Sequence, residues 1–160
     1  MKSGLSQNAQ KFQEKLFELG FHDFEVIEMP DTTRTATDAA QAVGCEVGQI
    51  VKSLVFMTKD SRKPVLVETC GSNRVNEEKI STLLGEQIIK ADADFVRLKT
   101  GFVIGGIPPV GHNEEMITYI DEDLMKYQEI WAAAGTPNAV FKLTPENLIT
   151  LTHGKITSIK

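Results

Sequence analysis

Two apolar runs joined by a short polar segment constrain the fold of this chain most. Residues 51–57, VKSLVFM, and residues 64–70, PVLVETC, are rich in β-branched residues and other apolar side chains, a composition that favours strands. The segment between them, TKDSRK, is short and polar and therefore predicts a hairpin. Any fold for this sequence has to accommodate an antiparallel pair of strands.

Helices and further strands surround this pair in an irregular order. An amphipathic pattern closed by Gly20 predicts a helix over residues 3–20, and capping residues followed by glycines predict others over 35–44, 76–85, 92–101 and 144–154. Strands are expected at 24–29, 116–120, 129–135 and 139–143, with a helical turn at 121–126. We therefore expect one domain over residues 1–160, of α/β class (α+β mixed), with a mixed, largely antiparallel, barrel-like sheet and flanking helices.

Composition indicates a globular cytoplasmic protein. The chain has 160 residues, of which 41% are hydrophobic and 24% charged, and no apolar run reaches the ~18–20 residues that cross a membrane. Its first residues lack the apolar centre of a secretory signal. The two cysteines and three histidines are scattered without the spacing of a zinc site, so neither a metal nor another cofactor is expected.

The charge distribution limits the contact with nucleic acid. The net charge of −5 argues against a DNA-binding groove or any broad surface that neutralises phosphates. Residues 52–99, however, hold nine Lys or Arg against seven Asp or Glu, a balance of +2, while the rest holds eight against fifteen. A small contact with the end of a polynucleotide remains compatible with this distribution.

The stretch GGIPPVGH, residues 105–112, follows a strand-like run, GFVI. Proline fixes φ and removes an N–H, whereas glycine lets another molecule approach the main chain. The stretch is consistent with a sharp turn between strands or with a loop that aims backbone groups at a ligand. His112 at its end is consistent with a capped or surface histidine as well as with a functional one.

Three further features each allow two interpretations. Lys52 shares a strand face with Leu54 and Phe56. In one interpretation its side chain reaches outward to water, and in the other it is a shielded cation that polarises an ester or holds a phosphate. The segment GTPN, residues 135–138, is a tight turn that can also line a site. Cys70 lies at the end of a strand. It is either a small core residue or a nucleophile, which would need a nearby base.

The order of these segments resembles a known family. The runs TRTATDAAQAVGCEVGQIVKSLVF, NEEKISTLLG, ADADFVRLKTGFVIGGIPPVGH and AAAGTPNAVFKLTPENL are similar to the YbaK/ProX family of aminoacyl-tRNA deacylases, and to the editing domain inserted in bacterial prolyl-tRNA synthetases. The resemblance covers roughly residues 24–152. It implies a mixed barrel-like sheet with surrounding helices, no metal, and hydrolysis of the ester that joins a wrong amino acid to the 3′ end of a tRNA.

The resemblance also implies a set of site residues. Lys52 stands at the family's lysine, and with Gly105 and Gly106 it forms the expected catalytic set. The expected substrate-binding residues are those of the two loops, together with Thr35 at the start of the nearby helix: Thr35, Ile107, Pro108, Pro109, Gly111, His112, Gly135, Thr136, Pro137 and Asn138. The segment CGSNRVNEEK differs from the glycine–aspartate form of the synthetase insert, so no amino-acid specificity is carried over.

These residues fit hydrolysis of a mischarged tRNA that carries a small amino acid. Glycine N–H groups can stabilise the charge that develops on the ester oxygen, while water or a ribose hydroxyl serves as the nucleophile or its activator. Cys, Ala, Ser and Thr stay open as the amino acid removed. An aminoacyl-tRNA synthetase is a further expected partner. Two alternatives stay open: a non-catalytic module that binds a nucleotide or tRNA end and acts through a protein partner, and a small-ester hydrolase that depends on Cys70.

Overall fold

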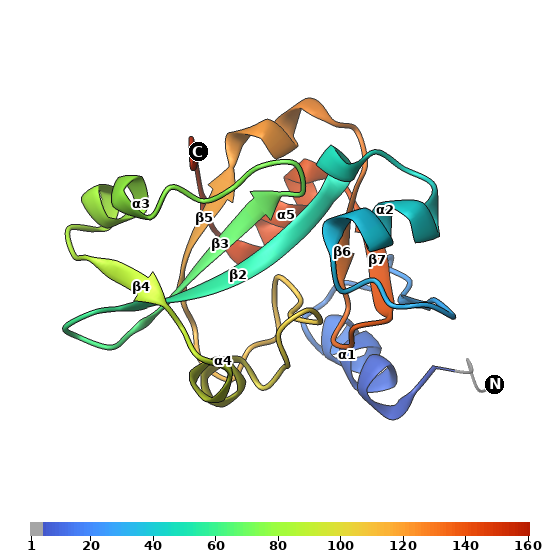
Figure 1. Cartoon of the computed structure of the whole chain (residues 1–160). Coiled ribbons are helices and arrows are strands. Elements are labelled where there is room, and N and C mark those ends of the chain that lie inside the picture. Colours follow the sequence, from blue (N-terminus) through green and yellow to red (C-terminus); the bar gives the residue numbers. More distant parts are fainter. Residues whose placement is uncertain (1–4) are drawn as a thin grey trace.

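The predicted hairpin forms the centre of the structure. The computed structural model describes residues 5–160, and in it β2 (Ile50–Thr58) pairs antiparallel with β3 (Pro64–Cys70). Every residue of β3 is buried, because elements cover both faces of the sheet at this point, and a strand in that position reads as a continuous apolar run. Figure 1 shows the pair crossing the middle of the molecule.

Six more strands extend the hairpin into one mixed sheet. The new strands are β1 (Ile27–Glu28), β4 (Ile88–Lys90), β5 (Ile117–Asp121), β6 (Ile130–Ala133), β7 (Ala139–Leu143) and β8 (Lys155–Thr157). The order is β1-β7-β6-β2-β3-β5-β8, with β4 paired to β2. Four strand pairs are antiparallel and three are parallel. The predicted mixed sheet is confirmed, and it stays open, since β1 and β8 lie at its two ends.

One side of β2 is paired only at its ends. Strand β6 pairs with Ile50 and Val51, and β4 pairs with residues 56–58. Residues 52–55 therefore have no strand partner on that side among the described residues. This opening, which we call the β2 gap, is bounded by sheet at both ends.

Helices flank the sheet, as the capping residues predict. They are α1 (Gln7–Glu18), α2 (Ala36–Val43), α3 (Glu77–Leu84), α4 (Ala93–Thr100) and α5 (Pro145–Thr152), with short 3-10 turns η1 (Val47–Gln49) and η2 (Glu122–Lys126). The side chains of Thr35, Asn76, Asp92 and Thr144 each accept a hydrogen bond from a backbone N–H in the first turn. Ser6 caps α1, so this helix begins later than predicted.

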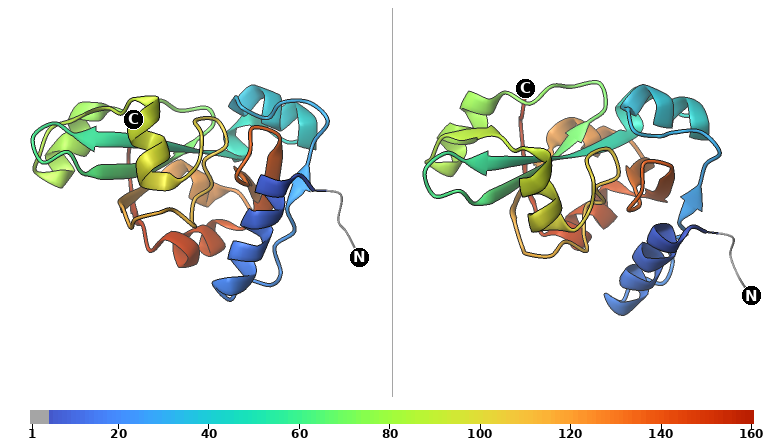
Figure 2. Two further views of the ribbon diagram at one scale, coloured as in Figure 1. Left: turned by 90° about the horizontal axis from the view of Figure 1, so that it is seen from below. Right: turned by 60° about the horizontal axis from the view of Figure 1, so that its bottom comes forward.

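The helices divide between the two faces of the sheet. Figures 1 and 2 show α2 and α3 on one face, α1 and α5 on the other, and α4 along the lower edge. The packing agrees, because Ile50 contacts the alanines of α2, whereas Val51 belongs to the cluster that contains Phe12 of α1 and Leu148 of α5. None of the helices within residues 5–160 is long and apolar enough to cross a membrane.

The strand-like run 101–104 is not a strand, so that interpretation is wrong. Gly101 ends α4 in the left-handed conformation, and the N–H of Phe102 donates to Thr100 Oγ1 over 3.0 Å. Two residues later a tight turn begins, closed by a 3.0 Å hydrogen bond from Gly106 N–H to the carbonyl of Val103. A helix end and a turn so close together leave no room for extended backbone. The long loop from α4 to β5 therefore starts at residue 101.

Candidate active site

A cavity of about 330 Å³ opens at the β2 gap. Its floor is the edge of β2, and its walls come from the start of α2, the loop after α4, and strands β6 and β7. The lining residues are Thr33, Arg34, Thr35, Ala36, Ala39, Ile50, Val51, Lys52, Ser53, Leu54, Val55, Phe56, Lys90, Ala91, Val96, Ile104, Gly105, Ile107, Trp131, Ala132, Ala133 and Val140. We call it the β2 cavity.

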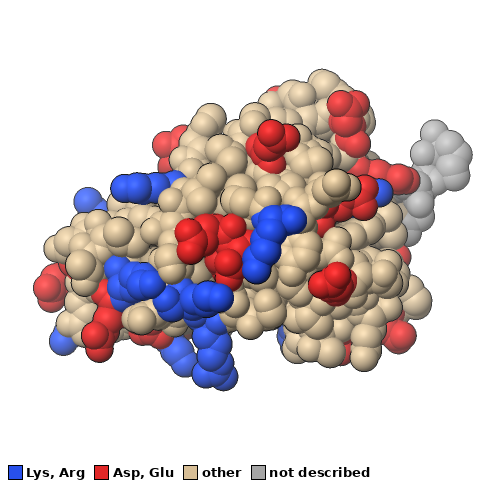
Figure 3. Space-filling model, turned by 90° about the horizontal axis from the view of Figure 1, so that it is seen from above, with Lys and Arg blue, Asp and Glu red and all other residues tan. Residues whose placement is uncertain are grey.

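The β2 cavity is apolar with a cationic component. Arg34, Lys52 and Lys90 line it, and none of the described lining residues is acidic. The whole chain has a net charge of −5, so this local excess of positive charge runs against the average. The molecule seen from above in Figure 3 shows a different face, on which Lys and Arg side chains lie mainly toward one end, with Asp and Glu side chains among them. Such a cavity favours a ligand with an apolar part and an anionic part.

Lys52 is half-buried, and its ammonium group has a defined position. Its Nζ donates to the backbone carbonyl of Asn73 over 3.1 Å. Burial lowers the pKa of Lys52, and the nearby positive charge of Arg74 lowers it further. Of the two interpretations of this lysine, the shielded cation agrees with its place in the cavity lining.

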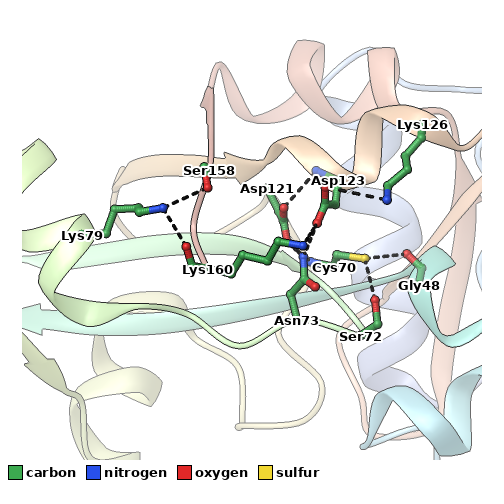
Figure 4. Close-up of polar contacts among 10 residues, drawn as sticks. All are labelled: Gly48, Cys70, Ser72, Asn73, Lys79, Asp121, Asp123, Lys126, Ser158 and Lys160. Atoms are coloured by element: carbon green, nitrogen blue, oxygen red, sulfur yellow. Dashed lines mark hydrogen bonds and ion pairs between the residues drawn. The ribbon is translucent and has the colours of Figure 1, made fainter.

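The Asn73 segment that holds Lys52 is itself anchored. Asn73 Nδ2 donates to Asp121 Oδ2 over 2.9 Å and to Asp123 Oδ2 over 2.8 Å, and Lys160 Nζ lies 3.0 Å from the same Asp123 oxygen. Figure 4 shows these side chains converging from the β3–α3 loop, the end of β5, η2 and the chain end. Two carboxylates on one amide fix the loop, and with it the carbonyl that Lys52 contacts.

The glycine–proline loop, residues 105–112, reaches the cavity with Gly105 and Ile107. Gly105 has φ +93°, which L side chains rarely adopt. Gly106 packs so closely on the second loop that an added Cβ would lie 2.7 Å from the backbone carbon of Thr136. The carbonyl of Gly106 accepts a 3.0 Å hydrogen bond from the N–H of Gly135. The two predicted loops therefore form one unit.

The GTPN turn is tied to the segment before α2. The carbonyl of Pro137 accepts from the N–H of Thr33 over 2.6 Å and from its Oγ1 over 3.0 Å. The N–H of Asn138 donates to Thr136 Oγ1 over 3.1 Å, which closes the turn. This arrangement fixes the start of α2, where Thr35 lines the cavity.

The structure places the predicted site residues in four locations, apart from Pro108, whose carbonyl contacts His112 within the glycine–proline loop. The lining of the β2 cavity includes Thr35, Lys52, Gly105 and Ile107. The contact between the two loops is made by Gly106 and Thr136, and the GTPN turn continues from it through Pro137 and Asn138. Gly111 and Gly135 line a second hollow next to α1, and Pro109, Gly111 and His112 line a third. The loop thus reaches the β2 cavity through Gly105 and Ile107, not over its full length.

His112 supports the loop and does not line the β2 cavity. Its Nε2 lies 2.7 Å from the carbonyl oxygen of Pro108, and its ring packs edge-on against Phe102. Burial lowers the pKa of His112, and the hydrogen bond to Pro108 partly offsets this. Because a carbonyl oxygen only accepts, Nε2 carries the proton in this contact.

The backbone N–H groups at the start of the glycine–proline loop differ in whether they have a hydrogen-bond partner within the protein. The N–H of Gly106 is used in the turn to Val103. Within residues 5–160, no group accepts a hydrogen bond from the N–H of Gly105 or Ile107. Both residues line the β2 cavity.

Several lining residues were not predicted. Arg34, Lys90 and Trp131 come from separate elements, and nothing in the local sequence places them together. Ser53 belongs to the opposite strand face from Lys52, yet both line the cavity because it lies at a strand edge. Cys70 is a buried core residue, as the first interpretation held, with Sγ 3.0 Å from the carbonyl of Gly48.

Comparisons with known proteins agree with this architecture. The aminoacyl-tRNA editing domain model matches residues 30–151. EbsC of Enterococcus faecalis, described as a candidate Cys-tRNA(Pro)/Cys-tRNA(Cys) deacylase, is 28% identical over 130 residues, covering 78% of this chain and 76% of that protein. The proline–tRNA ligase of Limosilactobacillus fermentum is 34% identical over 94 residues, which are 56% of this chain but 16% of the ligase.

A solved structure gives a match over nearly the whole chain. The crystal structure of a candidate trans-editing enzyme for prolyl tRNA synthetase superposes with a TM-score of 0.93 at 47% identity, covering 98% of this chain and 99% of that one. The predicted resemblance is confirmed, and the chain belongs to the aminoacyl-tRNA editing domain family, that of the YbaK-type deacylases.

Proposed function

We propose that this protein is a trans-editing deacylase, which hydrolyses the ester of a mischarged tRNA that carries a small amino acid. The observation that carries the proposal is the β2 cavity, whose lining includes Lys52 together with Gly105 and Ile107. The relatives described as editing enzymes support the tRNA end as substrate and a synthetase as partner.

The cations of the cavity suit the end of a tRNA. Arg34, Lys52 and Lys90 surround an apolar interior, so the terminal phosphate is attracted to the rim while the acyl group enters the apolar part. A contact with one strand end needs few phosphate partners. This agrees with the acidic character of the rest of the chain.

The unpaired backbone donors suit ester hydrolysis. Attack on the ester carbonyl develops negative charge on its oxygen, and donors already in place stabilise that charge. The N–H groups of Gly105 and Ile107, which have no partner within residues 5–160, can serve as such donors, and Lys52 adds positive charge to the lining of the same cavity. Water is the nucleophile in this scheme, and a ribose hydroxyl of the substrate activates it.

Cys70 does not fit the role of nucleophile. Its Sγ is fully enclosed, contacts the carbonyl of Gly48 and the hydroxyl of Ser72, and is outside the β2 cavity lining. Neither contact is a general base. Cys70→Ser is therefore expected to retain deacylation.

The size of the cavity supports a small acyl group. A volume of about 330 Å³ is at the lower end of ligand pockets, which span roughly 300–1,000 Å³. Trp131, Ile50 and Val96 restrict its walls. Larger amino acids are then excluded by size, which is how a second site rejects the correct product.

A panel of mischarged tRNAs tests the proposal. Purified protein is incubated with tRNAs that carry Cys, Ala, Ser, Thr or a large amino acid, and the release of amino acid is followed over time. We expect hydrolysis of at least one small-acyl tRNA well above the spontaneous rate and little hydrolysis of the large one. A protein inactive on the whole panel would contradict the proposed function.

A further inference from the structure

Glu68 is a fully buried carboxyl group in the middle of β3. Its side chain is 0% exposed, and its Oε2 has no hydrogen-bond partner among the described residues. No ion pair joins it to a Lys, Arg or His of residues 5–160. Burying a carboxyl without a cation is costly, so this residue calls for a role beyond packing.

The partner of Glu68 lines the β2 cavity. Ser53 Oγ lies 2.6 Å from Glu68 Oε1, and the two residues are directly opposite in the β2–β3 register. Ser53 is also within the β2 gap and is one of the lining residues. Ser53 therefore contacts the buried carboxyl and also lines the cavity.

The backbone of Ser53 points into the same gap. Hydrogen bonds from Gly71 N–H to the Ile50 carbonyl, 2.7 Å, and from Thr58 N–H to the Lys63 carbonyl, 2.9 Å, set the phase of the hairpin. Even-numbered residues of β2 consequently bond to β3, and the N–H of Ser53 faces away from it. The N–H of Ser53 is therefore a donor at one edge of the cavity.

The protonation of Glu68 decides which way its hydrogen bond with Ser53 runs. Burial raises the pKa of Glu68 to about 8, although the hydroxyl of Ser53 opposes this, so the carboxyl is mostly protonated at neutral pH. Ser53 Oγ donates to Oε1 of an ionised Glu68. A protonated carboxyl can instead donate from Oε1 to Ser53 Oγ, which leaves Oε2 as an unpaired acceptor, and this costs less than an unpaired donor. The O–H of Ser53 is then free for the cavity.

We propose that Ser53 is a catalytic hydrogen-bond donor to the carbonyl oxygen of the bound ester, and that Glu68 is the positioning residue which holds the Ser53 hydroxyl in its donating orientation. This inference rests on the proposed function. It adds a donor on the sheet side of the cavity to those of Gly105 and Ile107 on the loop side. No bond to Ser53 forms, so the step remains a direct hydrolysis.

Single-turnover hydrolysis of the best tRNA substrate tests both roles. Ser53→Ala is expected to lower the rate constant on the order of 10²-fold, the effect of one lost oxyanion donor, with little change in the concentration for half-saturation. Glu68→Met, which keeps the volume but not the hydrogen bond, is expected to give a similar loss. Glu68→Gln can donate from Nε2 to Ser53 Oγ and is expected to retain activity within a few fold.

Two comparisons separate this role from a structural one. Ser53→Ala combined with Glu68→Met is expected to be no slower than Ser53→Ala alone, because Glu68 acts through Ser53. Glu68→Met is expected to unfold at the same or a higher temperature than the wild type, since a buried carboxyl is removed. Ser61→Ala is the matched control: its hydroxyl also contacts a carboxylate, Glu86, at 2.9 Å, but on the exposed hairpin.

The outcomes are distinct. An active wild type with an unimpaired Ser53→Ala or Glu68→Met variant overturns this inference and leaves the proposed function intact. A folded Glu68→Gln variant that loses as much activity as Glu68→Met also overturns the inference. If Glu68→Met does not fold, Ser53→Thr, which keeps a hydroxyl, is compared with Ser53→Ala in its place. Equal rates of hydrolysis by these two variants overturn the inference. A wild type inactive on all charged tRNAs overturns the proposed function and this inference with it.

Discussion

Lys52 Nζ donates a 3.1 Å hydrogen bond to the backbone carbonyl of Asn73, so the position of the cation depends on a loop outside the cavity. That loop is in turn held by the carboxylates of Asp121 and Asp123. The amine is therefore fixed before any substrate arrives. Preorganisation of this kind lowers the cost of binding and catalysis.

Asn73→Ala should weaken deacylation without removing a group from the cavity. The substitution deletes both hydrogen bonds to the carboxylates, so the carbonyl that holds Lys52 becomes less fixed. We expect kcat/KM to fall about tenfold, corresponding to roughly 1.4 kcal/mol, measured on the best mischarged tRNA. Asn8→Ala, on the exposed side of α1, is the control and should behave as wild type.

Gly106→Ala should disrupt the contact between the two loops. The new methyl group would meet the Thr136 backbone at 2.7 Å, so the loop must move and displace Gly105 and Ile107. We expect a loss of about 1–3 kcal/mol in stability and a loss of activity greater than tenfold at temperatures where the variant is folded.

Gly20→Ala provides the comparison for that variant. Gly20 has φ +93° and no atom near its position for Cβ, so alanine adds backbone strain of about 1 kcal/mol without touching the site. Equal activity losses in the two variants would show that the Gly106 effect is a general consequence of lower stability.

Glu68 should make the protein less stable as the pH rises from mildly acidic to alkaline. Its pKa is raised from 4.5 to about 8 in the folded protein, so the folded state binds the proton more tightly than the unfolded state. The stabilisation is complete below pH 4.5 and is lost as the pH rises through 8. We expect a decline of up to a few kcal/mol in the free energy of unfolding, measured by urea denaturation.

Glu68→Gln is the control for this pH dependence. It has no proton to lose, so the difference in stability between variant and wild type should change in the variant's favour between pH 5 and 8. A difference that stays constant over this range would show that the carboxyl is not protonated in the folded protein.

His112 should have the opposite effect at acidic pH. Burial lowers the pKa of its ring below the ordinary 6.5, so the unfolded state binds the proton more tightly. The stabilisation is present above pH 6.5 and is lost as the pH falls through the lowered pKa. His112→Gln, which can still donate to the Pro108 carbonyl, should lose less stability on acidification than the wild type in the same denaturation experiment.

Local sequence patterns predicted most elements because capping and apolar periodicity act over a few residues. Thr35, Asn76, Asp92 and Thr144 cap helices where the patterns placed them. The run 101–104 was misread, since its apolar residues follow a helix cap and precede a tight turn. The short strands β4 and β8 gave no strong pattern, because pairing with neighbours rather than composition defines them.

The candidate site was predicted only where the sequence carries a distinctive pattern. Lys52 and the glycine–proline loop stand out as residues that packing alone does not explain. The β2 gap, by contrast, results from β6 and β4 ending at different points along β2, which no local pattern reveals. Ser53, Arg34 and Trp131 became visible as lining residues only when these strands were placed.

The central claim is that the Lys52 cation and the main chain of Gly105 and Ile107 act on one ester in the β2 cavity. The most direct measurement is the rate of deacylation of the preferred mischarged tRNA by Lys52→Ala, with Lys63→Ala on the exposed hairpin as the matched control and circular dichroism to confirm folding. We predict that Lys52→Ala loses most of its activity while Lys63→Ala keeps it. A folded Lys52→Ala protein with wild-type activity would contradict the account.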